Sequence, residues 1–337
     1  MRIPKTMSTV FFLAVFLISC TEQKSNLTIG FLVDSFEVAR WQKDKKYFTE
    51  KIAELGAEVI VKSAGGDEAV QYAQAMELIG QGVKVLVVVA SNANTAAAIV
   101  REAHKKNVKV IAYARIIKNC ELDYFITFNV EKIGIQQADY IQQQIPKGNY
   151  VLINGDKLDI NAIIEHNGVI KSLQAGIGKG NINLVYDGYI EGWSPRNAAF
   201  TMKKVIEFCN EDINAVIVGN DGMAGGVYSA LAEYGLSGTV LITGLDAEAV
   251  ALKRILNGDQ AMTVYMSIKK LAYANAELAV RLLKNEKITD ELNFINNGRI
   301  DVPSIILEPQ SVDKNNIKST VIAEEYLTME DIENSTY

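Results

Sequence analysis

Short apolar runs alternate with stretches of helical periodicity along most of this 337-residue chain. The runs are rich in Val, Ile and Leu, as buried strands are, while the stretches between them place apolar residues three and four positions apart. In the first half we expect strands at 27–34, 57–62, 83–90, 108–113 and 125–128, and helices at 41–55, 68–79 and 95–104. Apolar strands separated by helices predict a parallel sheet that is covered on both faces.

The same alternation restarts near residue 150. Here we expect strands at 150–154, 184–189, 215–218, 240–244 and 262–265, a long helix at 268–283, and short segments at 292–295 and 304–307. The predicted fold class is therefore α/β, with two similar doubly wound parallel-sheet lobes. Ligands of such sheets lie beyond the carboxyl ends of the strands, so two lobes that face each other would share one binding cleft.

The N-terminus has the pattern of an export signal. Arg2 and Lys5 precede a continuous apolar run at 7–19, which is shorter than the roughly 20 residues of a membrane span. The run ends in Leu-Ile-Ser-Cys at 17–20, which resembles a bacterial lipobox, and the chain then becomes polar. We expect a lipoprotein signal peptide at 1–19, lipid attachment to Cys20, and a tether at 20–26. The alternative is an ordinary secretory signal in which Cys20 is coincidental.

Composition and charge exclude several function classes. The net charge is −6, and no run of Lys or Arg could neutralise nucleic-acid phosphates. The chain has two histidines, His104 and His166, and neither lies in a recognisable base motif. It has no GxSxG or GxxxxGK[ST] motif, no CxxC pair, and no GxGxxG spacing in the glycine-rich segment 219–226. We therefore expect no enzymatic activity, no metal site and no cofactor.

Two further cysteines follow Cys20. Cys209 lies on an apolar helical stripe and is expected to be a core thiol, whereas Cys120 lies in a polar connection and is expected near the surface. A disulfide between them would suit an oxidising compartment. It would also tie the two lobes together, so we favour free thiols.

Polar and aromatic residues follow the apolar strands, at the edge where a ligand of an α/β sheet would lie. They are Arg40, Trp41, Arg115, Asp159, Asn161, Trp193, Asn220, Asp221 and Asp246. Carboxylate, amide and guanidinium groups pair with sugar hydroxyls at fixed angles, and aromatic faces cover the C–H face of a sugar ring. Each residue alone also has a structural interpretation, since Asp221 could cap a helix and Trp193 could belong to the core. Their joint placement indicates a carbohydrate site.

Ordered, collinear motifs link the chain to a known family. They include RWQKD at 40–44, SAGGDEA at 63–69, EGWSPRNA at 191–198, NDGMAGG at 220–226, MTVY at 262–265, NNGRIDVPS at 296–304 and DKNNIKSTVI at 313–322. With these motifs, the segment from about 27 to 322 resembles the D-xylose-binding proteins of bacterial ABC importers, within the type I (ribose/galactose-binding-like) periplasmic sugar-binding family.

The resemblance implies two lobes joined by a hinge with three crossings, near 129–131, 265–267 and 297–301. The first lobe would combine 27–130 with 267–298, and the second lobe would combine 131–266 with 299–337, including the polar tail. The resemblance also implies a set of residues that bind the sugar: Arg40, Lys43, Arg115, Asp159, Asn161, Trp193, Asn220 and Asp246.

Four positions depart from the family pattern towards apolar residues. They are Ala114, where Asp is usual, Val130, which ends a Phe-Asn-Val segment where Phe-Asp-Asn is usual, Leu245, where Gln is usual, and Met266, where Lys is usual. We expect Ala114, Leu245 and Met266, together with Trp41, to line the pocket as well. Loss of an acid at 114 together with a base at 266 can be nearly neutral, because neither charge is left unpaired. The pocket then fits either a sugar with fewer hydroxyls, such as a deoxy sugar, or xylose at lower affinity.

The resemblance implies an extracytoplasmic solute-binding protein that captures a monosaccharide by hinge closure, the ligand being xylose or a related pentose or deoxy sugar. Its partner would be the permease of an ABC importer. The alternative partner is a membrane histidine kinase, with this protein as the sugar sensor. We expect a monomer in the cell envelope, in the periplasm or on the outer face of the cytoplasmic membrane. It would be attached to the membrane by its lipid anchor only, because no later segment reaches transmembrane length.

Overall fold

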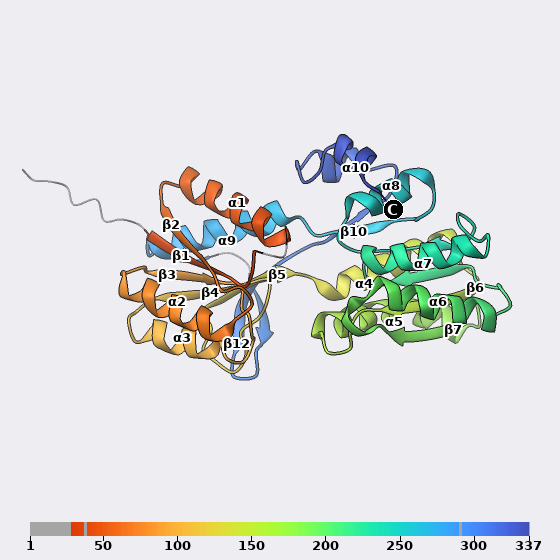
Figure 1. Cartoon of the computed structure of the whole chain (residues 1–337). Helices are drawn as coiled ribbons and strands as arrows, with labels where there is room; N and C mark the ends of the chain where they lie inside the picture. Colours follow the sequence, from red (N-terminus) through yellow and green to blue (C-terminus); the bar gives the residue numbers. More distant parts are fainter. Residues whose placement is uncertain (1–27, 37–38, 290–291, 337) are drawn as a thin grey trace, which may run out of the picture.

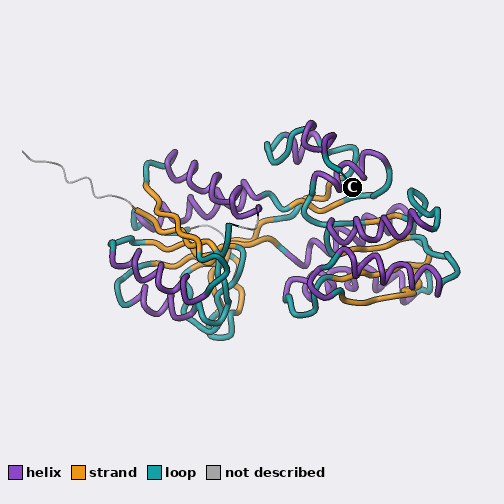
Figure 2. Tube along the Cα trace, viewed as in Figure 1, coloured by secondary structure: helices purple, strands orange, loops and turns teal. Residues whose placement is uncertain are grey.

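The computed structural model describes residues 28–36, 39–289 and 292–336. The expected signal peptide at 1–19, the expected lipidation site Cys20 and the tether at 20–26 lie outside the described residues. Two lobes lie side by side and are joined by the hinge segments between them (Figure 1). In each lobe the strands run between layers of helices (Figure 2). Across the described ranges, none of the helices combines the length and the apolar character that a membrane span needs.

The first lobe is built on a seven-stranded sheet with the strand order β11-β12-β5-β4-β3-β1-β2. Its strands are β1 (Thr28–Val33), β2 (Glu58–Ser63), β3 (Val85–Val88), β4 (Lys109–Tyr113), β5 (Tyr124–Phe128), β11 (Asn293–Asn296) and β12 (Asp301–Leu307). Neighbouring strands are parallel, except for the antiparallel pair of β11 and β12 at one edge. The mostly parallel order agrees with the predicted fold class.

Helices cover both faces of this sheet and give the first lobe two cores. Helices α1 (Ala39–Glu54) and α9 (Ile268–Leu283) lie on one face, and α2 (Glu68–Gly80) and α3 (Ala97–His104) lie on the other. Successive strand side chains point to opposite faces. Phe31 of β1 therefore joins the core of α1 and α9, where its ring centroid lies 4.5 Å from that of Phe48, while Leu32 joins the core of α2 and α3.

The second lobe has a four-stranded parallel sheet with the order β7-β6-β8-β9. Its elements are β6 (Gly148–Asn154), β7 (Ile182–Tyr189), β8 (Ala215–Val218), β9 (Leu241–Ile242), α4 (Val130–Gln144), α5 (Ile160–Gly178), α6 (Pro195–Phe208), α7 (Asp221–Glu233) and α8 (Ala249–Asn257). Helices α4 and α5 cover one face, and α6 and α7 cover the other. A Cβ on Gly134 of α4 would lie 2.0 Å from the backbone oxygen of Glu165, so glycine permits the close approach of α4 to α5.

The chain passes between the lobes at 129, at 266–267 and at 308–309. The first passage joins β5 to α4, the second joins β10 (Thr263–Tyr265) to α9, and the third joins β12 to β13 (Gln310–Val312), which pairs antiparallel with β10. The third passage corrects our expectation. We expected it at 297–301, with 299–307 in the second lobe, but β12 pairs with β5 and belongs to the first sheet.

The polar tail folds back onto the second lobe. It contains the short π-helical segment η2 (Lys318–Ile322) and the helix α10 (Met329–Asn334). Ile332 is fully buried in a cluster with Leu252 and Ile255 of α8, and Nζ of Lys253 donates to the backbone oxygen of Glu333 at 2.9 Å. This end of the described chain therefore contributes to the core.

The burial of the two described cysteines differs from our expectation. Both are free thiols, but Cys120 is buried in the first lobe and Cys209 is only partly buried at the end of α6. The loop that contains Cys120 is held against the lobe by a buried side chain. Nδ2 of Asn297 donates to the backbone oxygens of Ile117 and Cys120 at 3.0 and 2.9 Å. Burial accordingly raises the pKa of Cys120 to about 11.

Candidate functional site

A cavity of about 180 Å³ lies at the carboxyl edge of the second-lobe sheet. It is lined by Val130, Ile133, Asp159, Asn161, Glu165, Trp193, Asn220, Leu245, Asp246 and Met266. This set contains five of the residues expected to bind the sugar and two of those expected to line the pocket. Most of the lining residues come from the segments that follow β6, β7, β8 and β9, and the others come from the start of α4 and from the hinge. The parallel topology brings the first group together.

A larger cavity of about 740 Å³ lies between the lobes. The first lobe lines it with Ala114, Arg115 and Phe128, among others, and the second lobe lines it with residues at the start of α5. Asp159 and Asn161 line both cavities, so the two spaces adjoin. A small molecule in the smaller cavity would therefore lie beside the space into which Arg115 faces.

Two of the predicted polar residues also begin helices. Asp159 is the N-cap of α5, and its Oδ1 accepts a hydrogen bond from the backbone nitrogen of Asn161 at 2.8 Å. Asn220 is the N-cap of α7, and its Oδ1 accepts from the backbone nitrogen of Met223 at 2.9 Å. The capping role fixes the position of each side chain at the cavity wall. The structural and the ligand-facing interpretations therefore apply to the same residues.

The indole ring of Trp193 packs against the backbone of two glycines. A Cβ built on Gly155 would lie 2.2 Å from the Trp193 ring, and one built on Gly219 would lie 3.1 Å from it. The ring also packs against the apolar core beneath α6 and α7 while it lines the 180 Å³ cavity. Trp193 has a φ of 53° after Gly192 at 64°, a tight turn that aims the ring inwards. The ring is thus held as a flat wall for the cavity.

Asp246 is held in the cavity by an unusual backbone conformation. Its φ is 107°, and its backbone nitrogen donates to the oxygen of Val264 at 2.9 Å. Non-glycine residues with φ in this range are uncommon and cluster at functional sites. Burial raises the pKa of Asp246, and the charge of Arg40 on the first lobe opposes that rise. The carboxyl group of Asp246 therefore interacts electrostatically with a cation of the first lobe.

Asp221 does not line the 180 Å³ cavity, and its buried carboxyl group has a structural role. Its carboxyl accepts hydrogen bonds from Gln260 Nε2 at 2.9 Å, Thr263 Oγ1 at 2.9 Å and the backbone nitrogen of Glu248 at 3.0 Å. Burial raises the pKa of Asp221 to about 8. These bonds fasten α7 to the segment that leads into the hinge strand β10, so Asp221 supports the site from behind.

The first lobe presents two arginines next to a buried tryptophan. The guanidinium carbons of Arg40 and Arg115 lie 4.9 and 5.4 Å from the ring centroid of Trp41, which is 3% exposed. Nη1 of Arg115 donates to Asp34 Oδ2 at 2.8 Å, and Nε of Arg40 lies 3.4 Å from Asp44 Oδ2. Stacking and ion pairing hold both guanidinium groups in place. Trp41 supports the arginines and does not line either of the two cavities described above.

Lys43 lies at the C-terminal segment and not at the cavity wall. Its Nζ donates to the backbone oxygen of Tyr326 at 2.8 Å and lies 4.0 Å from the centroid of the Tyr326 ring. Burial lowers the pKa of Lys43. In this structure the residue therefore joins α1 to the tail.

Glu165 is a lining residue that the sequence interpretation did not include. It is 4% exposed and lies four positions after Asn161 on α5, so both side chains share one face of the helix. Burial raises the pKa of Glu165 well above its ordinary value, with contributions from the charges of Asp246 and Asp159. The signal that could have found it is the Asn161–Glu165 spacing on a helix whose first turn was already assigned to the site.

The cavity wall is acidic. Among the lining residues of the 180 Å³ cavity there are three carboxyl groups, those of Asp159, Glu165 and Asp246, and no Lys, Arg or His. The charge of Arg40 on the first lobe acts on one of these groups, that of Asp246. Over the described ranges of the chain, no group of three or more His, Cys, Asp or Glu side chains could hold a metal ion.

Comparison with known proteins agrees with this geometry. Residues 29–287 match the family model described as a periplasmic binding protein domain. The chain belongs to the periplasmic binding protein family. The D-xylose-binding periplasmic protein of Haemophilus influenzae is 40% identical to it over 319 residues, which are 95% of this chain and 96% of that protein. The D-xylose-binding periplasmic protein of Escherichia coli is 40% identical over 309 residues, which are 92% of this chain and 93% of that protein.

A solved relative confirms the fold of this periplasmic binding protein. The crystal structure of a carbohydrate transporter solute binding protein from Chloroflexus aurantiacus, in complex with D-glucose, superposes with a TM-score of 0.78 at 26% identity. The match covers 90% of this chain and 97% of that one. The type I fold and the family resemblance predicted from the sequence are thus confirmed. Since the family and its relatives are binding proteins, the prediction that the chain is not an enzyme is confirmed as well.

Proposed function

We propose that this periplasmic binding protein captures a monosaccharide, xylose or a related pentose or deoxy sugar, by closing its two lobes around it. The observation that carries the proposal is the convergence of Asp159, Asn161, Asn220 and Asp246 with the Trp193 ring on one cavity. That cavity adjoins the interlobe space into which Arg115 faces. The xylose-binding relatives support the choice of ligand.

Closure of the two lobes would follow because each lobe contributes a different part of the binding site. The carboxylates and amides belong to the second lobe and the arginines to the first, so only a ligand held between the lobes contacts both sets. Such a ligand has a higher affinity for the closed form and shifts the equilibrium towards it. Exclusion of water from the closed site would strengthen each hydrogen bond. The apolar wall of Val130, Leu245 and Met266 would pack against the part of the sugar that carries no hydroxyl.

The same proposal includes export, anchoring and delivery. The basic start, the apolar run at 7–19 and Cys20 support a lipoprotein that is held at the outer face of the cytoplasmic membrane or in the periplasm. Mass spectrometry of the mature N-terminal peptide would check for a diacylglyceryl group on Cys20. The protein would act as a monomer. The carbohydrate-transporter relative supports delivery of the sugar to the permease of an ABC importer.

A thermal-shift panel of pentoses, hexoses and deoxy sugars tests the proposed ligand. A sugar at 100 times its Kd should stabilise the protein by about 2.7 kcal/mol, which raises the Tm by a few degrees. We expect Trp193→Ala and Arg115→Ala to abolish this shift. The matched controls are Phe208→Ala, which removes an 81% exposed ring, and Arg299→Ala, which removes an exposed ion pair with Glu121. A full shift in both site variants would show that the site is misplaced.

A further inference from the structure

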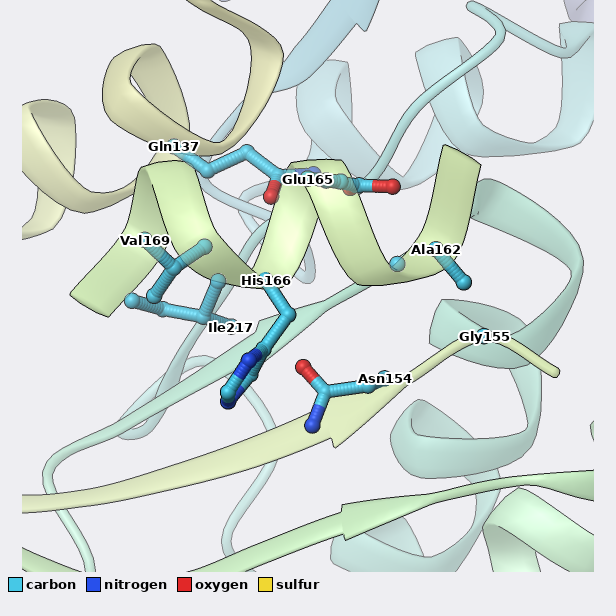
Figure 3. Close-up of a pocket in the computed structure, with 9 residues that line it drawn as sticks. Gln137, Asn154, Gly155, Ala162, Glu165, His166, Val169 and Ile217 are labelled. Atoms are coloured by element: carbon cyan, nitrogen blue, oxygen red, sulfur yellow. The ribbon is translucent and has the colours of Figure 1, made fainter. Parts of the chain in front are cut away.

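Glu165 forms the wall between two cavities of the second lobe. On one side it lines the 180 Å³ cavity, and on the other it lines a space of about 10 Å³ that it shares with Gln137, Asn154 and His166 (Figure 3). The small space holds at most one water molecule. A residue in this position determines what the inner end of the sugar cavity presents to a ligand.

The hydrogen bonds around Glu165 leave one oxygen without a donor. Oε1 of Glu165 is buried and has no hydrogen-bond partner among the described residues, although the side chain of Gln137 on α4 points towards Glu165 (Figure 3). Nε2 of Gln137 donates to the backbone oxygens of Val218 and Gly244, at 3.1 Å each. Both amide hydrogens are therefore used, and the orientation of the amide is fixed. Oε1 of Gln137 is itself buried, and no described residue donates a hydrogen bond to it.

Neither Oε1 of Glu165 nor Oε1 of Gln137 receives a hydrogen bond, and an ionised carboxylate has no hydrogen to donate. Two buried acceptors without donors are costly, and a buried charge without a partner costs more. One proton on Glu165 provides the missing donor and removes the charge. A buried carboxylic acid that stays neutral in order to donate a hydrogen bond is an established device in other proteins.

The charges that face Glu165 favour the same state. Asp246, in the loop after β9, and Asp159, at the start of α5, both oppose its ionisation. From α4 the facing side chain is Gln137, which carries no charge. Burial raises the pKa of Glu165 most, and the nearby amide of Gln137 opposes only part of that rise. His166, the next residue of α5, is directed to Asp187, with Nε2 2.9 Å from Oδ2. No cation is among the groups that act on Glu165 in the described structure.

We propose that Glu165 is a specificity-determining residue of the sugar cavity that works as a neutral acid: it contributes its proton to the space beside Gln137 and accepts a hydrogen bond from a hydroxyl of the ligand. This inference rests on the proposed function. It specifies an uncharged sugar that carries a hydroxyl at its inner end. A sugar acid that places its carboxylate at this inner end is excluded, because the carboxylate would meet the three acids of the cavity wall and no base there.

The test compares three forms of the full chain by calorimetric titration with xylose. Glu165→Gln keeps a neutral donor and acceptor in the same shape, so its affinity should stay within about threefold of the wild type. Glu165→Ala removes the hydrogen bond to the ligand and should weaken binding about tenfold. Glu58→Gln, at an exposed position on β2, serves as the control and should leave the affinity unchanged. As pH rises through the raised pKa of Glu165, wild-type affinity should fall relative to that of Glu165→Gln.

Infrared spectroscopy reads the proton directly and separates a ligand contact from a merely structural role. At pH 7 the wild type should show the carbonyl stretch of a protonated carboxylic acid that is absent from Glu165→Gln, and xylose should shift that band. A missing band, a band that xylose does not shift, or wild-type affinity in Glu165→Ala would each overturn the inference and leave the proposed function standing. Failure of the wild type to bind any sugar of the panel would instead overturn the proposed function.

Discussion

At the scale of single residues, the site depends on side chains that have two tasks. Asp159 and Asn220 cap helices and line the cavity, and Trp193 packs on the core and lines the cavity. The positions of these groups are therefore fixed before a ligand arrives, which lowers the entropic cost of binding. Gly155 is part of this pre-organisation although it offers no side chain, because its missing Cβ leaves room for the Trp193 ring.

Gly155→Ala should weaken sugar binding without a direct contact to the ligand. The new Cβ would lie 2.2 Å from the Trp193 ring, and the ring must move away from the position that forms the cavity wall. We expect the affinity for xylose to fall at least about tenfold, as for other displaced positioning groups. The control is Gly80→Ala at the end of α2, where a Cβ meets nothing within 4 Å. Calorimetric titration that gives equal affinities for both variants would contradict the proposed role of Gly155 in positioning the Trp193 ring.

The sequence predicted the residues that follow strands but not those one helical turn further on. Asp159, Asn161, Trp193, Asn220 and Asp246 were found because the end of an apolar strand is a local signal. Glu165 lies inside a helix, and its burial depends on the approach of α4 from elsewhere in the chain. The position of Lys43 against Tyr326 depends on how the tail folds back, which no local pattern encodes.

At the scale of elements, the predictions succeeded for strands and helices that local periodicity defines. They failed for the strand whose lobe depends on its pairing partner. The apolar runs at 27–34 and 83–90 became β1 and β3, since an apolar, β-branched run has one stable place in a covered parallel sheet. Residues 301–307 form a strand that could serve either lobe by its pattern alone. The parallel pairing of β12 with β5 assigns it to the first sheet, and such pairing is a property of the assembled chain.

The C-terminal elements provide a prediction at this scale. Ile332 of α10 is fully buried against α8, although the sequence around it is polar. Ile332→Ala should therefore lower the free energy of unfolding by about 2–4 kcal/mol, as for other buried aliphatic truncations. Ile160→Ala, at a side chain that is 51% exposed, should change it by less than about 1 kcal/mol. Urea denaturation measures both values, and equal, small losses would show that the tail is not part of the core.

At the scale of the whole molecule, the two lobes divide the work of binding. The second lobe supplies carboxylates, amides and an aromatic wall, and the first supplies Arg40 and Arg115, which are held on Trp41. The charge of Arg40 already acts on Asp246 in the described structure. Three short passages of chain join the lobes, so a rotation about them can bring the two sets of groups onto one ligand.

Small-angle X-ray scattering with and without xylose tests directly whether a single sugar holds the two lobes together. The radius of gyration of the wild-type protein should decrease at saturating xylose, because contacts from both lobes favour the closed form. Trp193→Ala should show no decrease at the same concentration. Saturating binding by the wild type, verified by calorimetry, without any change in the radius of gyration would contradict the account.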